Sequence, residues 1–85
     1  MGFPVDLSNV LPKEVGTVES RPFSIRRRDL RVVVSKVSET LYDLAVYETV
    51  KGQEHRRYGT DRPVIVEVLE FAWKNFHEDF PNIFE

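Results

Sequence analysis

Alternating apolar and polar residues predict β-structure in the first half of the chain. Between residues 22 and 37 a period of two holds on either side of an arginine-rich interruption, with apolar positions at Phe23, Ile25, Leu30, Val32 and Val34. A period of two places alternate side chains on opposite faces of a strand. The pattern fits two short strands joined by a turn at Arg28-Asp29, or one long strand that carries a bulge there.

Residues 38–51 fit two structures. As a strand, the even-numbered residues from Tyr42 to Val50 would share one face. As a helix, the two leucines and Ala45 would fall at three- and four-residue spacing. We favour the strand because tyrosine, valine and threonine dominate the segment and Lys51-Gly52-Gln53 can form a hairpin loop. Residues 54–59 would then return as a short strand, whose charges suit the edge of a sheet.

Residues 61–80 are predicted to form a helix. Thr60 or Asp61 is placed to cap it, Pro63 suits its first turn, and Pro81 is expected to end it. The stretch from 64 to 68 is rich in β-branched residues and also suits a strand. The helix is favoured because polar residues recur at a spacing that only a helix gathers onto one face, namely at Glu67, Glu70, Lys74 and His77.

The apolar side of this helix is wider than one sheet needs. At roughly 100° per residue, its apolar residues spread over an arc of about 220°. A helix packed on a sheet needs a stripe only somewhat wider than about 100°. The centre of the arc should face the sheet, and it contains Ile65, Leu69, Ala72 and Phe76. The excess must be covered by another part of the chain or by a partner.

Trp73 is the main candidate for a partner contact. It lies near one edge of the arc beside Val66, and Phe71 lies at the other edge. Tryptophan is often energetically dominant in interfaces because it buries a large area at little entropic cost. We therefore predict that these three residues contact a protein partner or a second copy of the chain. In the alternative, the N-terminal arm or the tail with Ile83 and Phe84 covers Trp73.

These elements predict a single small α+β domain over residues 1–85. Its core would be an antiparallel β-meander of three or four strands within residues 21–59, with the helix of residues 60–80 packed on one face and a tail at 81–85. Pro4 and Pro12 interrupt residues 1–20, which are expected to form an extended arm over the domain or a partner. Eighty-five residues are too few for two independent cores.

The amino-acid composition excludes several kinds of chemical site. The chain has no cysteine, which excludes disulfides, cysteine-bound zinc and thiol catalysis. No apolar run approaches the roughly 18 residues that span a bilayer, and the first residues do not resemble a signal peptide. A cytoplasmic location without membrane contact is therefore expected.

Basic residues are concentrated in two blocks. The first contains Arg21, Arg26, Arg27, Arg28, Arg31 and Lys36, and the second contains Lys51, Arg56, Arg57 and Arg62. Because the whole chain carries a net charge of −2, these blocks are local patches on an acidic protein, whereas nucleic-acid binders are usually strongly basic. We predict that Arg26, Arg28 and Arg31 contact a protein partner. In the alternative, Arg26, Arg27, Arg28, Arg56 and Arg57 bind nucleic acid.

Catalytic motifs are scarce. His55 and His77 lie on separate elements without metal-ligand spacing, and the isolated glycines form no phosphate-binding loop. A metal-independent ribonuclease is the best enzymatic alternative, with His55 as acid or base and Arg56 or Arg57 neutralising phosphate charge. The favoured function is non-enzymatic, without metal or cofactor. It is that of a small adaptor, assembly factor or inhibitor, of the kind that phages and mobile elements encode, which occupies a surface on a macromolecular partner.

Overall fold

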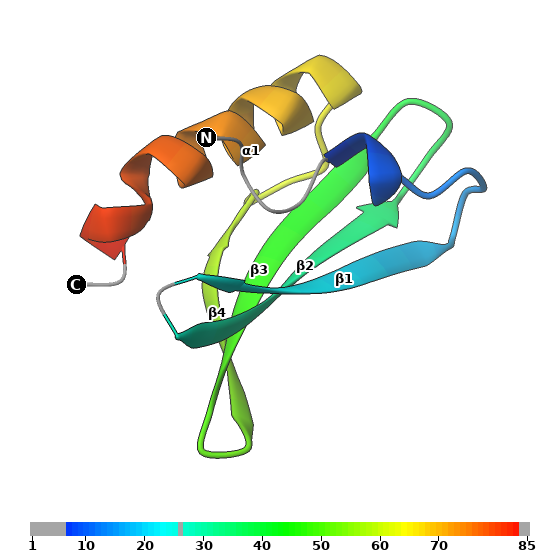
Figure 1. Ribbon diagram of the computed structural model, residues 1–85. Helices are drawn as coiled ribbons and strands as arrows, with labels where there is room; N and C mark the ends of the chain where they lie inside the picture. Colours follow the sequence, from blue (N-terminus) through cyan, green and yellow to red (C-terminus); the bar gives the residue numbers. More distant parts are fainter. Residues whose placement is uncertain (1–6, 26, 84–85) are drawn as a thin grey trace.

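The chain folds into a four-stranded antiparallel sheet with one helix across a single face (Figure 1). The computed structural model describes residues 7–25 and 27–83, with only the backbone for Ile25 and for residues 77–83. The strands follow one another in the sheet in chain order, which confirms the predicted α+β meander. The elements are η1 (Leu7–Asn9), β1 (Val18–Ile25), β2 (Arg28–Lys36), β3 (Tyr42–Val50), β4 (Gln53–Gly59) and α1 (Val66–Ile83).

The first hairpin turns earlier than the sequence pattern indicated. Ile25 pairs with Arg28 and Ser24 pairs with Asp29, so the chain reverses before Arg28 and not at Arg28-Asp29. Both residues of the expected turn have partners in the ladder, and the Ser24 hydroxyl lies 3.3 Å from the Asp29 carboxylate. Arg27 takes a φ of +67°, a conformation that tight hairpins require.

The strand prediction for residues 38–51 is confirmed by β3. Lys51 and Gly52 have φ values of +53° and +81°, as the two central residues of a type I′ turn do. The loop therefore consists of these two residues, and Gln53 already belongs to β4. Tyr47 pairs with Arg56, and a bulge next to Tyr47 leaves Arg57 without a register partner.

The core lies between α1 and one face of the sheet. Leu30, Val32 and Val34 on β2, with Leu44 and Val46 on β3, are buried at alternate positions, as the period of two predicted. Leu69, Trp73 and Phe76 of α1 complete this layer together with Phe23.

The N-terminal segment contributes to this core. Leu7 and Val10 are buried in it, and η1 places them one turn apart. This short turn was not evident from the sequence, and residues 18–20, which were assigned to the arm, belong to β1. The expectation that the arm begins extended concerns residues 1–6, which lie outside the described residues.

The helix begins later than predicted. Val64 pairs with Tyr42 through two backbone hydrogen bonds of 2.8 and 2.9 Å, so residues 61–65 are not helical and α1 starts at Val66. The β-branched residues of this stretch therefore favour sheet pairing, and the helix begins only after that pairing ends. At the other end, α1 includes Pro81 and continues to Ile83, whereas a stop at Pro81 was expected. Proline removes one helical hydrogen bond but does not by itself end the helix.

Candidate functional site

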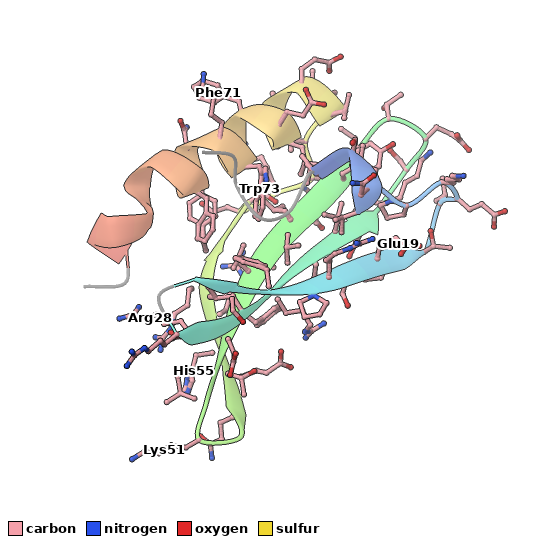
Figure 2. The ribbon with its side chains drawn as sticks, viewed as in Figure 1. Glu19, Arg28, Lys51, His55, Phe71 and Trp73 are labelled. Atoms are coloured by element: carbon pink, nitrogen blue, oxygen red, sulfur yellow. The ribbon has the colours of Figure 1, made fainter. Side chains whose placement is uncertain are left out.

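Trp73 lies in the core instead of at an open edge of the helix. It is only 7% exposed, and its ring meets Phe23 edge-on, with centroids 6.1 Å apart. On its other side it stacks on Phe76 at 5.4 Å. The sheet itself supplies this cover through Phe23 on β1, which a helix wheel alone does not reveal. Figure 2 shows Trp73 beneath α1, toward the sheet, and Phe71 on the opposite side of the helix.

The exposed apolar surface of α1 is the flank that carries Phe71. Phe71 is 64% exposed, and Ile65 and Val68 are each 45% exposed. These three residues form what we call the α1 flank. Ile65 was expected at the centre of the buried arc, but it precedes the first helical residue and does not face the sheet. Val66, the third predicted contact, is half-buried.

Acidic side chains border the α1 flank. Glu67 and Glu70 are both exposed, as is Lys74 farther along α1. These three are members of the polar strip that the sequence predicted. The flank is therefore an apolar strip beside a predominantly acidic helical surface.

Glu48 contacts two of the arginines that were predicted to bind a partner or nucleic acid. The residue is 6% exposed, and its carboxylate accepts a hydrogen bond of 2.9 Å from Nε of Arg57. Nε of Arg28 lies 3.8 Å from its second oxygen. Glu48 follows the same alternation as Leu44 and Val46, and a carboxylate on the core-facing side of a strand needs a cationic partner, so the pattern itself indicates this contact.

The other arginines that were predicted as binding residues do not contact Glu48 in the described part of the chain. Arg31 lies on the sheet face away from α1, where it makes two hydrogen bonds of 3.0 Å to Glu54. Its guanidinium also stands 5.4 Å from the centre of the Tyr47 ring. Arg56 pairs across the sheet with Tyr47, and Arg27 lies in the first turn. The nucleic-acid set is thus divided between two faces and a turn, and its member Arg26 lies outside the described residues.

Two residues of the ribonuclease alternative, His55 and Arg57, lie next to Glu48, whereas Arg56 lies on the other face of the sheet. The neighbouring Tyr58 has a structural place: its hydroxyl donates a 3.0 Å hydrogen bond to the Ala72 carbonyl, and its ring packs against Phe76. His55 is exposed on β4, opposite Glu48 in the register, while Arg57 is engaged by that carboxylate. In the described ranges, no group of three or more histidine and acidic side chains is placed to hold a metal ion.

Comparison with known proteins adds no identity. A scan against family models and searches of curated proteins and of solved structures find no match to this chain. Among residues 7–25 and 27–83, no helix is both long and apolar enough to cross a membrane.

Proposed function

We propose that this chain is a non-enzymatic binding protein of the cytoplasm that docks on a protein partner through the α1 flank. The observation that carries this proposal is the 64% exposure of Phe71 on a helix whose opposite side fills the core. Val68 and Ile65 extend the same apolar strip. Aromatic anchors surrounded by smaller apolar contacts are a common centre of protein interfaces.

The chemistry of the flank suggests the shape of the partner. An amphipathic helix commonly binds by laying apolar residues spaced three and four apart into a hydrophobic groove. Val68 and Phe71 lie three residues apart on α1, Ile65 lies three residues before Val68, and Glu67 and Glu70 are exposed beside them. A complementary partner therefore presents an apolar groove with basic residues along its rim, because opposite charges steer and orient the encounter.

A different protein suits this surface better than a second copy of the chain. Three side chains of this size expose a few hundred Å² at most, whereas a standard interface buries about 800 Å² on each partner. A two-fold dimer would also bring the same patch of both copies together. Glu67 and Glu70 would then meet their own counterparts across a small interface. A different protein whose groove extends beyond the α1 flank would bury more area and would not bring the two glutamates against their own copies.

The proposal is tested by capture and reconstitution with matched variants. Tagged wild type, Phe71→Glu and Val18→Glu are used to capture proteins from an extract of the source cells, and the captured partner is then purified and titrated by calorimetry. Val18 is a suitable control because it is 59% exposed and lies on β1. We expect Phe71→Glu to weaken binding by at least about 30-fold, as the loss of an interface hot spot does, and Val18→Glu to leave it unchanged.

Three outcomes would contradict the proposal. In the first, a purified partner binds Phe71→Glu as tightly as the wild type. In the second, no specific partner is captured by the wild type. In the third, sedimentation shows that wild type self-associates and Phe71→Glu does not, which would assign the flank to a second copy of the chain.

A further inference from the structure

Arg56 differs from the other arginines of β2 and β4. Arg28, Arg31 and Arg57 each lie beside a glutamate, whereas no ion pair in the described part of the chain joins Arg56 to a carboxylate. Its Nη2 instead donates a 3.2 Å hydrogen bond to the Thr60 carbonyl. A guanidinium has five N–H donors, so this single contact leaves most of its donors available.

Gly59 makes room for this arrangement. A Cβ atom at Gly59 would collide with the guanidinium of Arg56 and the carbonyl oxygen of Leu44, and it would lie 3.1 Å from the Cα of Ala45. The absence of a side chain thus lets the guanidinium rest against the backbone. Arg56 is exposed, and its guanidinium lies against the backbone between Gly59 and Thr60.

A pocket of about 300 Å³ lies next to this guanidinium, on the sheet face away from α1. Val33 and Ala45 contribute apolar surface to it, and Tyr47 adds an aromatic ring. Its volume is at the lower end of the range for small-molecule sites. The pocket is therefore large enough for one compact ligand group beside Arg56.

The charges of the lining restrict the ligand. Arg56 and Arg62 supply positive charge, while Asp43 and Asp61 line the same pocket. The planar fork of arginine matches the two oxygens of a carboxylate. Asp43 and Asp61 would repel a polyphosphate but accept hydrogen bonds from an N–H group. A matching ligand thus combines one carboxylate, one N–H group and a small apolar body.

We propose that this pocket binds the carboxylate of an apolar amino acid, either free or at the C-terminus of a peptide. Arg56 holds the carboxylate, the surface from Val33 and Ala45 contacts the apolar side chain, and the aspartates receive the N–H group. The site is separate from the α1 flank. Its test is therefore independent of the proposed docking function.

The ligand class is tested by titrating ¹⁵N-labelled protein and following its amide NMR signals. The probes are L-leucine, N-acetyl-L-leucine, N-acetyl-L-leucinamide, and a short peptide ending in leucine with a free or an amidated C-terminus. We expect the compounds with a free carboxylate to shift the amides of Ala45, Tyr47 and Arg56, and the amidated compounds to leave them unchanged. Stronger binding of L-leucine than of the peptide identifies the free amino acid as the source, and the reverse identifies a peptide end.

Variants of Arg56 test the role of the guanidinium. Arg56→Gln is expected to weaken N-acetyl-L-leucine binding by at least about tenfold, because a charge-assisted pair is lost. Arg27→Gln makes the same change of charge at an exposed turn and should bind like the wild type. Arg56→Lys keeps the charge without the planar fork and should bind with intermediate affinity. It also serves as the test variant if the glutamine form does not fold.

Four results would overturn the proposal. They are equal shifts with the amidated compounds, unchanged binding by a folded Arg56 variant, no shift with any carboxylate at millimolar concentration, and a larger response to pyrophosphate than to N-acetyl-L-leucine. The last of these would mark the pocket as a polyanion site.

Discussion

Nε of Arg57 lies 2.9 Å from Oε1 of Glu48, and this ion pair joins β4 to β3 on the side of the sheet that carries α1. The bulge beside Tyr47 frees Arg57 from the ladder, and its side chain reaches the buried carboxylate. Desolvation of the buried carboxylate offsets much of the attraction in such a pair, so the intact pair adds little net stability. Removing one partner of the ion pair nevertheless lowers the free energy of unfolding, because the buried charge that remains loses its partner.

Arg57→Ala is therefore expected to destabilise the fold by about 1–3 kcal/mol, since among the described residues it leaves the Glu48 carboxylate with the longer contact to Arg28. Urea unfolding measures this difference. Arg27→Ala removes an exposed turn arginine and should change the stability by less than about 0.5 kcal/mol. Equal changes in stability for the two substitutions would show that the ion pair between Arg57 and Glu48 does not stabilise the fold.

Gly52→Ala should cost about 1 kcal/mol because Gly52 has a φ of +81°, which alanine adopts poorly. A Cβ atom at this position would meet nothing within 4 Å, so the cost is purely conformational. Lys51→Asn should instead stabilise the protein slightly, because Asn-Gly is the preferred type I′ pair. Thermal melts of both variants give opposite shifts if the turn has this type, and shifts of the same sign would refute it.

Gly59→Ala should be more harmful than Gly52→Ala, for a steric reason. The added methyl group would press on the backbone of Leu44 and Ala45, and neither backbone can move without breaking the pairing of β3 with β4. A loss of about 1–3 kcal/mol is expected, as for overpacked sites. Chemical denaturation of the two alanine variants side by side measures the order, and a Gly59→Ala protein as stable as the wild type would contradict this account.

Trp73→Ala and Phe71→Ala should behave in opposite ways. Trp73 packs between Phe23 and Phe76, so its truncation is expected to cost about 3–5 kcal/mol, much of the stability of so small a domain. Phe71 is mainly in solvent, and its truncation should change the stability by less than about 0.5 kcal/mol. Circular dichroism melts compare them directly. A cooperative, wild-type-like melt of Trp73→Ala would show that the tryptophan is not part of the core.

Local patterns predicted the elements whose residues interact with near neighbours. The period of two identified the buried faces of β2 and β3, and the polar strip of α1 indicated a helix in the correct region. Lys51 and Gly52 form a two-residue turn with φ values of +53° and +81°, as a local hairpin signal predicts. In each case the signal extends over a few adjacent residues and does not depend on distant packing.

Long-range contacts determine the features that the sequence did not reveal. The start of α1 depends on the pairing of Val64 with Tyr42, and the cover over Trp73 comes from Phe23, fifty residues earlier in the chain. The exposure of the α1 flank follows from the direction in which the helix faces the sheet. The prediction of an excess apolar surface on the helix therefore agrees with the structure, but Trp73 is not the exposed residue.

Site-specific photo-crosslinking tests the docking proposal most directly. A benzoylphenylalanine at position 71 keeps an aromatic ring on the α1 flank, and the same residue at position 18 samples a comparably exposed site on β1. After irradiation in the source cells, the account predicts one discrete adduct with a different protein from position 71 and none from position 18. Identical adducts from both positions, no adduct from position 71, or an adduct with the mass of two copies of this chain would contradict it.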